Sequence, residues 1–453
     1  MRGINQLLSR RLRRAQKFDL KVAEYKFIPK VMLDSTAQRN SSSVTGDDPR
    51  LTTGSFVSDN ATFSATVTQQ LPTGGRLDLT AAHYLDSAHT TGLQRADSYG
   101  LFLTQPLLKG GGMEVGTASI KNARFTDSVN QLYLKTTLMD TVSSVIYAYW
   151  YFLQTVKQIE ISRQSLERAK ESMAVTRELI TAGRMSEMEI VQNEADIANR
   201  EISLLSSENN ADAARIALLK LFDLGRNTPL VPTEPLTVES ALPTYEECRQ
   251  QAFVNRTDYL IAALNVDIAK TNVTVAQNNR LWDLSLIGGV EKSPVTAWEQ
   301  PRFEGTTDNW NTGIRLSIPL GDLTPQQGYV AAKVGLDKAE VAFAKVKDTV
   351  ELELRDTLRE AEMKLRQVKL AQESRKLYER KLDVEKEKLR AGRSTNFQVV
   401  SSQNDLFFAR NYELTSIISY VTARTALDRV LGVTLEKWGI KVADRSGDEK
   451  YYK

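Results

Sequence analysis

The sequence contains few of the residues that most often build reactive sites. It has one cysteine, Cys248, and two histidines, His83 and His89, in 453 residues. A single cysteine excludes an internal disulfide. It also does not indicate whether the protein works in an oxidising or a reducing compartment. Both histidines lie in a Gly/Ser/Thr-rich stretch typical of loops, so no metal site is expected. No nucleophile–base pair or phosphate loop is visible. We therefore predict no catalytic residue, no cofactor and no enzyme.

Long hydrophobic runs and a strong charge imbalance are also missing. The formal net charge is +3 and 25% of the residues are charged, which gives no reason to expect nucleic acid as a partner. The longest apolar run, residues 145–153, is shorter than the roughly 18 residues that span a bilayer as a helix. If the protein lies in a membrane, it must cross as a closed β-barrel, because only that form satisfies every strand hydrogen bond in lipid.

Proline and glycine are almost absent from two long stretches. Residues 113–181 contain no proline and one glycine, Gly116, which predicts a helix of about 100 Å. A return helix is predicted at 187–222, and apolar side chains recur every seven residues in both. These side chains are Ile159, Leu166, Met173, Ile180 and then Ile190, Ile197, Leu204, Ala211, Leu218. This spacing predicts a long antiparallel coiled-coil hairpin.

Other segments alternate with period two and predict strands. Residues 62–68 and 76–81 flank a turn at 71–75 and form a hairpin signal (extra hairpin, 61–85). Further strands are predicted at 99–104, 283–290 and 312–320. Polar loops are predicted at 40–60 and 291–311. A helix at 244–279 precedes the later strands, and a second long hairpin is predicted at 325–391 and 395–431.

One unit of this chain is repeated at a fixed spacing. Ala-Gly-Arg at 182–184 recurs at 391–393, and the helical motif at 214–218 recurs at 423–427, both 209 residues later (392 − 183 and 423 − 214). We predict a first repeat at 1–224 with strands about 30–108 and a hairpin about 113–222. A Pro-rich linker at 225–243, a second repeat at 244–432 with strands about 283–320 and a hairpin about 325–431, and a tail at 433–453 complete the chain.

Three local features have simpler structural interpretations than functional ones. The triglycine at 110–112 lacks the Lys-Ser/Thr of a P-loop and is interpreted as a strand-to-helix corner. Glu187 and Glu189 lack an acid–base partner and are interpreted as a solvated helix start. The aromatic run at 147–152 covers all faces of a helix and indicates packing between helices.

Taken in order, these features resemble the TolC-like outer-membrane efflux and secretion factors over residues 15–435. The most specific motifs are the duplication, the junctions Gln105-Pro106-Leu107 and Ile318-Pro319-Leu320, and the two Ala-Gly-Arg turns. The resemblance implies a mixed α+β membrane protein: a homotrimer with four strands per chain in a 12-stranded outer-membrane β-barrel, continued into the periplasm by an α-helical barrel. It implies a passive exit duct for a tripartite efflux pump or a type I secretion system.

In that family the hairpin tips meet a periplasmic adaptor, which an inner-membrane pump loads, and form the gated entrance. The corresponding residues here are Gly183, Arg184, Met185, Ser186 and Gly392, Arg393, Ser394, Thr395. Some members carry aspartates six and nine residues after the second tip glycine, where this chain has Gln398 and Ser401. The first-repeat equivalents are Glu189 and Gln192, so a weaker acidic constriction is expected, with Glu189 its main source of negative charge.

Two features of the chain extend or depart from this resemblance. The extra hairpin either lengthens outer loops or adds strands, and the sequence leaves both open. The basic residues 1–14 are followed by no apolar core, so a signal peptide and part of a first helix are expected to be absent, and no nearby cysteine supports a lipid anchor. The alternatives are a periplasmic adaptor, which normally has one hairpin, and a structural coiled coil. The cargo and the resting state of the entrance are not specified.

Overall fold

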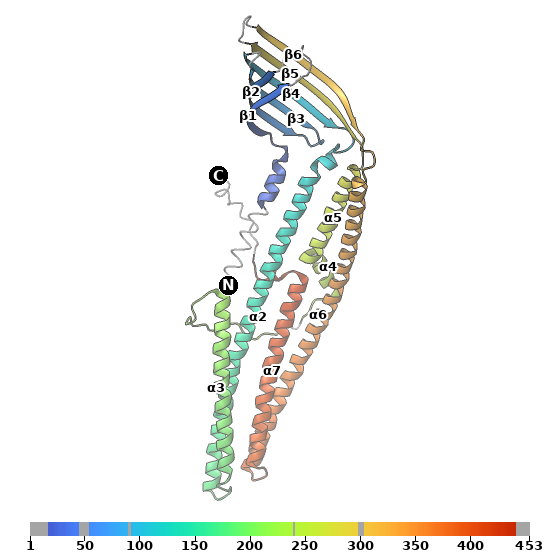
Figure 1. Cartoon of the computed structure of the whole chain (residues 1–453). Helices are drawn as coiled ribbons and strands as arrows, with labels where there is room; N and C mark the ends of the chain where they lie inside the picture. The colour runs from blue at the N-terminus through green and yellow to red at the C-terminus, as the bar shows by residue number, and fades with distance from the viewer. Residues whose placement is uncertain (1–16, 45–53, 89–91, 239–240, 298–302, 441–453) are drawn as a thin grey trace. The chain divides into compact units, whose positions relative to one another are not determined.

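The computed structural model describes residues 17–44, 54–88, 92–238, 241–297 and 303–440. The chain divides into two compact units (Figure 1). The sheet unit comprises Leu12–Asn130 and Ala262–Phe343. The helical unit contains Gln131–Ile261 and Ala344–Lys453. The sequence also predicts a first helix at residues 5–26, of which residues 5–16 lie outside the described residues.

The sheet unit contains one antiparallel sheet in the order β1-β2-β3-β4-β5-β6. Its strands are β1 (Lys30–Val44), β2 (Gly54–Gln70), β3 (Arg76–Ala88), β4 (Gly92–Pro106), β5 (Asp283–Ala297) and β6 (Phe303–Ser317). The expectation of four strands per chain is therefore wrong. The extra hairpin supplies β2 and β3, which lie inside the sheet between β1 and β4.

The two predicted polar loops are also wrong over much of their length. Strand β1 continues to Val44 and β2 starts at Gly54, while β5 continues to Ala297 and β6 starts at Phe303. Their Ser, Thr, Asn and Asp residues suggested loops. In the sheet, however, such residues pair across neighbouring strands, as Asn40 does with Ser58 and Ser43 with Ser55.

The strand register separates the side chains into an apolar and a polar face. One row of directly paired residues is apolar on all six strands: Val31, Val67, Leu79, Leu101, Val290 and Trp310. The neighbouring positions point to the opposite face, because strand side chains alternate. On that opposite face, the pair next to Val67 and Leu79 is Thr66 and Thr80, whose hydroxyl oxygens are 3.5 Å apart. A sheet with one apolar and one polar face is therefore present.

The strand-to-helix corner is closed by glycines and by one asparagine. Gly110 and Gly112 have φ angles of 79° and 97°. The Gly110 amide donates to Asn278 Oδ1 at 2.6 Å, and Asn278 Nδ2 donates to the Leu108 carbonyl at 3.0 Å. These bonds confirm the interpretation of the triglycine as a corner and tie it to helix α5 (Thr257–Asn278).

Two long helical hairpins, which Figure 1 shows, provide most of the helical unit, and the long first helix of each begins in the sheet unit. Helix α2 (Met113–Thr181) is followed by α3 (Glu189–Phe222), and α6 (Thr324–Arg390) is followed by α7 (Asn396–Leu431). These bounds confirm the helices predicted from the absence of proline. None of the described helices has an 18-residue window apolar enough to cross a membrane.

The predicted helix at 244–279 is interrupted. Helix α4 (Tyr245–Asn255) ends where Arg256 adopts an extended conformation (ψ 119°), and α5 begins at Thr257. Gly432, which caps α7 at φ 75°, lies against this break. A Cβ added there would lie 2.7 Å from the Asn255 carbonyl oxygen. The close approach of α7 explains why the chain needs glycine here.

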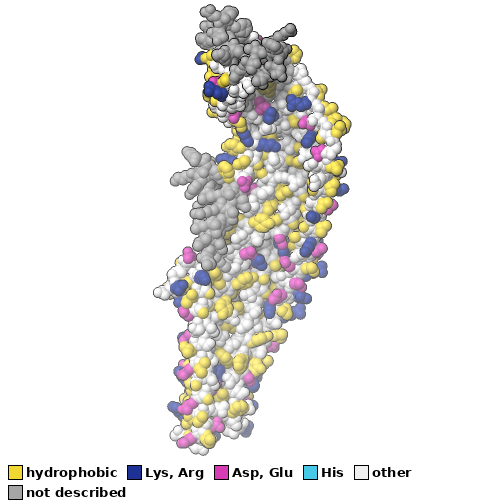
Figure 2. Space-filling view, in the orientation of Figure 1, with side chains coloured by type: hydrophobic (Ala, Val, Ile, Leu, Met, Phe, Trp, Pro, Cys, Tyr) yellow, Lys and Arg dark blue, Asp and Glu magenta, His cyan; other side chains and the backbone are white. Residues whose placement is uncertain are grey.

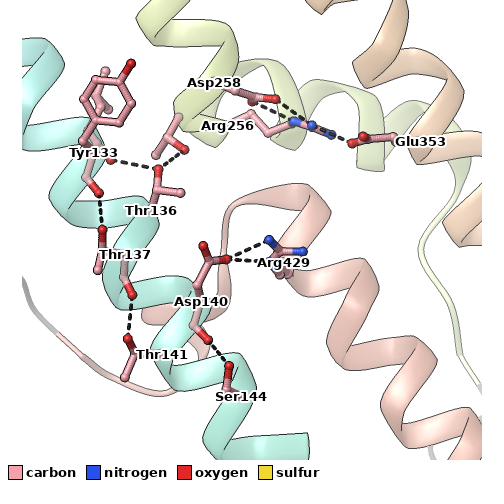
Figure 3. A network of polar contacts seen from close by, with 12 residues as sticks. Tyr133, Thr136, Thr137, Asp140, Thr141, Ser144, Arg256, Asp258, Glu353 and Arg429 are labelled. Atoms are coloured by element: carbon pink, nitrogen blue, oxygen red, sulfur yellow. Dashed lines mark hydrogen bonds and ion pairs between the residues drawn. The ribbon is translucent and has the colours of Figure 1, made fainter. Parts of the chain in front are cut away.

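Polar contacts join four helices around this break (Figure 3). Arg256 Nη2 lies 2.6 Å from Glu353 of α6 and 2.7 Å from Asp258. Thr257 and Thr136 of α2 share a 2.7 Å hydrogen bond. Arg429 of α7 pairs with Asp140 of α2 at 2.8 Å.

The linker after α3 packs on both hairpins. Leu230 contacts the buried cluster of the first hairpin, which includes Phe152 and Leu218. Leu236 and Val238 contact the buried cluster of the second hairpin around Tyr420, Leu365, Val368 and Ile417. The linker and the network around Arg256 therefore tie the hairpins together far along the helices from their tips.

Candidate functional site

Both hairpin tips end their first helix in the same backbone conformation. Gly183 and Gly392 have φ angles of 69° and 71°, a region that disfavours residues with a Cβ. The Gly183 amide donates to the Ile180 carbonyl at 2.9 Å, and the following amide donates to the Leu179 carbonyl at 2.9 Å. The second tip repeats both bonds, at 3.0 and 2.8 Å. Such bonds satisfy helix-end carbonyl groups that would otherwise lack donors.

The predicted tip residues differ in exposure. Arg184, Ser186, Arg393 and Thr395 are exposed, whereas Met185 and Ser394 are half-buried. Thr395 caps α7, because its hydroxyl accepts from the Gln398 amide at 3.3 Å. The hydroxyl of Ser394 donates to Glu385, and this bond lowers the pKa of the Glu385 carboxyl together with nearby Lys388. The two tips therefore present exposed guanidinium groups on ordered turns.

The tip of the first hairpin contacts the second hairpin. Met185 and Leu179 pack against a buried cluster of the second hairpin: Leu382, Leu389, Val399 and Leu406. Asn396, which is 1% exposed, donates to Glu189 Oε2 at 3.3 Å. Asn396 was not among the residues predicted for the site. Its position directly after the capping threonine was the only available signal.

The four predicted constriction residues differ in their surroundings. Glu189 is half-buried and held by Asn396. Gln192 and Gln398 are exposed on α3 and α7, and Ser401 is half-buried. Glu189 is the one acidic member of the four, and the structure connects it to the opposite hairpin.

Above the tips, a polar seam replaces part of the predicted apolar seam. The residues buried at seven-residue spacing on α3 are Asn193, Arg200, Ser207 and Ala214. Ile190, Ile197 and Leu204, which we predicted to form this seam, are half-buried. The prediction was therefore wrong for the lower half of α3 and right for Ala211 and Leu218. A seven-residue recurrence of polar residues was the overlooked signal.

The polar seam links the two hairpins. Arg200 is 4% exposed and bonds Asp196 at 3.2 Å, Ser165 at 2.8 Å and Asn404 of α7 at 2.5 Å. Arg410 of α7 donates to Gln164 of α2 at 2.7 Å. Charge-assisted hydrogen bonds of this kind are shorter and stronger than those between neutral groups. They fix the lateral position of one hairpin against the other.

One arginine beside this seam is poorly satisfied. Nε and Nη2 of Arg168 are buried without a hydrogen-bond partner. Burial lowers the pKa of Arg168 to about 10, and the positive charges of Arg410 and Arg200 add to this effect. The seam therefore contains a strained positive charge next to bonds that hold the hairpins together.

Comparisons with known proteins agree with this architecture. A model of the family described as "outer membrane efflux protein" matches residues 76–223 and 248–433. No curated protein sequence matches the chain. The outer-membrane channel OprN is 15% identical with a TM-score of 0.68, over 94% of this chain and 86% of that one. The outer membrane protein VceC of Vibrio cholerae is 13% identical with a TM-score of 0.65, over 94% and 92%.

A third similar structure is the open state of the MtrE outer membrane channel of Neisseria gonorrhoeae. It is 14% identical with a TM-score of 0.66, over 94% of this chain and 85% of that one. At these identities the structures establish a shared fold. The family match covers well over half of the chain, including both hairpins and strands β3 to β6. The chain therefore belongs to the outer membrane efflux protein family, whose members are outer-membrane exit ducts of tripartite efflux pumps that extend into the periplasm.

Proposed function

We propose that three copies of this chain form one continuous passive duct. Their sheets close into a single β-barrel in the outer membrane, and their hairpins form an α-helical barrel in the periplasm. The duct receives cargo from a periplasmic adaptor and an inner-membrane pump, or from a type I secretion system, and performs no chemistry itself. Its organisation follows the two proposed repeats, 1–224 and 244–432, separated by the linker 225–243.

The observation that carries this proposal is the sheet with two faces and two open edges. Strands β1 and β6 each have one neighbour in the described sheet, although each is 15 residues long. Long unpaired edges invite pairing with another chain. Because consecutive strands are antiparallel and their number is even, β6 of one copy can pair antiparallel with β1 of the next. Repetition around an axis would close the sheet and remove both edges.

Unpartnered apolar side chains on the helices support the same assembly. On α6, Met363, Leu370, Leu377 and Val384 follow one another at seven-residue spacing and expose 46%, 66%, 63% and 44% of their surface. On α3, Val191, Ile202 and Leu205 are 66–68% exposed. Figure 2 shows many hydrophobic side chains exposed among the charged groups of the helical unit. Two such stripes suit packing against helices of neighbouring copies.

The exposed tips are proposed as the adaptor-docking surface. Arg184 and Arg393 are the charged residues of the two turns, and neither is buried by the packing of the hairpins. Reversal of both charges, Arg184→Glu with Arg393→Glu, is expected to weaken adaptor binding while the trimer still forms. Unchanged affinity for the adaptor in a pull-down or in surface plasmon resonance would count against this assignment.

The seam above the tips is proposed to hold the entrance narrow. The bonds Asn396–Glu189, Arg200–Asn404 and Arg410–Gln164 cross between hairpins of one chain, at 3.3, 2.5 and 2.7 Å. The hairpins cannot separate laterally while these bonds remain. Glu189 would supply one carboxylate per chain to the entrance, which supports weak rather than strong cation selectivity.

Negative-stain imaging of the detergent-purified protein tests the proposed duct. A three-fold hollow particle is expected, with a cylindrical part whose length reflects the 67- and 69-residue helices. A compact or monomeric particle would instead favour the periplasmic adaptor or the structural coiled coil.

A further inference from the structure

We propose that each chain contributes six strands to the wall, so that the outlet is an eighteen-strand barrel wide enough for bulky hydrated cargo. This inference rests on the proposed trimeric duct and specifies its outlet. Strands β2 and β3, which make the difference from a twelve-strand wall, carry the argument.

The first observation is that β2 and β3 are integral parts of the sheet. Strand β2 pairs with β1 from Gly54 to Thr68, and β3 pairs with β4 over its whole length, from Arg76 to Ala88. Removal of the two strands would leave β1 with no neighbour. A hairpin that extended an outer loop would instead lie at the end of a strand pair, outside the ladder.

The second observation is that the turn of this hairpin is docked at the strand-to-helix corner. The Gly112 amide donates to the Thr73 carbonyl at 3.0 Å, and Thr73 Oγ1 donates to Gln105 Oε1 at 2.8 Å. A Cβ on Gly74 would lie 2.0 Å from the Gly110 carbonyl oxygen. A Cβ on Gly116 would lie 2.1 Å from the Pro72 carbonyl oxygen. This approach is possible only for glycine, so the sequence is adapted to the docked turn.

The third observation is that β2 and β3 have the same two faces as the other strands. Val67 and Leu79 belong to the apolar row, and Thr66 and Thr80 lie on the polar face. The polar face elsewhere on these strands carries Thr62, Ser64 and Thr68. A strand with one lipid-compatible face and one hydroxyl-bearing face suits a barrel wall around water.

The fourth observation is a sloping line of cross-strand pairs of ionisable side chains on the apolar face. Three pairs of directly opposed residues form this line: Arg39–Asp59 at 2.6 Å, His83–Asp97 at 2.6 Å and Lys292–Asp308 at 3.8 Å. The distance of each pair from the apolar row can be counted along its strand. Arg39 lies eight residues beyond Val31 (39 − 31), His83 four beyond Leu79 (83 − 79) and Lys292 two beyond Val290 (292 − 290). The pairs therefore mark the edge of the apolar band, and this edge descends from β1 to β6.

The slope of this edge gives the strand tilt expected of a barrel. From the first pair to the third, the edge drops by six residues, or ~20 Å at ~3.3 Å per residue. It does so across four strand spacings, or ~19 Å at ~4.8 Å each. In a barrel, the border of the apolar band runs parallel to the membrane plane. The strands must therefore be tilted by about 45° from the barrel axis, close to the 35–45° of transmembrane barrels. The line includes a pair on β1–β2 and a pair on β3–β4, so the extra hairpin follows the same border.

The strand number then sets the width. With ~4.8 Å between strands and a tilt of about 45°, eighteen strands close at a backbone diameter of about 39 Å, and twelve at about 26 Å. Barrels of 16–18 strands enclose an aqueous channel, unlike small barrels that side chains fill. The outlet would therefore pass solutes that a twelve-strand outlet excludes.

Site-directed spin labelling in reconstituted membranes tests the wall. The variants are Val67→Cys and Leu79→Cys on the apolar face, and Thr66→Cys and Thr80→Cys on the polar face. The matched control pair on β4 is Leu101→Cys and Thr104→Cys. The native Cys248 is 0% exposed and is not expected to react with the label. We expect labels at 67 and 79 to be accessible to oxygen in lipid and those at 66 and 80 to be accessible to a water-soluble nickel complex, as on β4.

The outcomes separate this inference from the proposed duct. If β4 alternates but all four labels on β2 and β3 are water-accessible, the hairpin lies outside the membrane wall and the eighteen-strand outlet is wrong, while the duct survives. If β4 also fails to alternate, the proposed membrane duct itself is wrong. A cross-section of the trimer by electron cryo-microscopy provides an independent count, for which eighteen strands are expected and twelve would overturn the inference.

Discussion

Leu377→Glu is expected to dissociate the trimer without unfolding the chain. Leu377 exposes 63% of its surface in the single chain, within the apolar stripe of α6. Full burial of a leucine is worth about 1.5–3 kcal/mol, so burial of this exposed part contributes about 1–2 kcal/mol per interface. Three equivalent interfaces give about 3–6 kcal/mol, which corresponds to at least about a hundredfold weaker assembly. Burial of an unpaired carboxylate would weaken it further.

The assay is native mass spectrometry of the detergent-solubilised protein, combined with helicity by circular dichroism. Glutamate is a good helix former and the site is exposed in one chain, so helicity should not change. The charge-matched control is Lys376→Gln, an exposed position a quarter-turn away on α6. The reasoning is refuted if Leu377→Glu remains trimeric at the concentration where the wild type does, or if the control dissociates equally.

The remaining predictions concern stability and conduction. Gly432→Ala should destabilise the protein by about 2 kcal/mol or more, and Gly392→Ala by about 1 kcal/mol, because both have positive φ but only Gly432 has backbone against the added methyl group. Arg168→Met should raise the midpoint of thermal unfolding, because it removes buried donors that cost about 1–3 kcal/mol. Burial raises the pKa of Glu379, but bonds from Arg410 and Arg375 lower it more, so its net pKa is depressed. Its stabilising contribution is therefore present above its ordinary pKa of 4.5 and is lost as the pH falls through the folded value, and Glu379→Gln should flatten the acid side of the stability profile. Glu189→Gln should reduce any cation preference measured as a reversal potential in planar bilayers.

Each of these predictions has an outcome that contradicts it. Equal losses for the two glycine variants would remove the steric argument at Gly432. A lower melting temperature for Arg168→Met would show that the guanidinium is satisfied in solution. An unchanged acid limb in Glu379→Gln would place acid sensitivity in other carboxylates. Strong cation preference that survives Glu189→Gln would assign the selectivity to other residues.

Much of the helical unit was predictable because its determinants are local. The absence of proline over 113–181 predicted α2 with its observed bounds, Met113–Thr181. Gly183 and Gly392 marked the two turns, since a residue with positive φ follows the end of a helix. The proposed duplication was likewise read from sequence, and it remains a prediction.

The polar contacts between hairpins were not predictable, because they depend on residues distant in sequence. Arg200 and Asn404 are 204 positions apart in the sequence, so no local signal indicates their hydrogen bond. A buried arginine is tolerated only where such partners surround it. The apolar period therefore indicated Ile197 for the seam, while the tertiary structure buries Arg200.

The sequence by itself determined where helices, turns and alternating strands occur, because backbone preference and side-chain periodicity act over a few residues. It also determined that strands carry an apolar and a polar face. Only the tertiary structure decided that the extra hairpin lies within a six-stranded sheet, because strand pairing and the docking of the turn at Gly74 against Gly110 are contacts between distant segments. The number of strands in the sheet is therefore a property of the fold and not of any local motif.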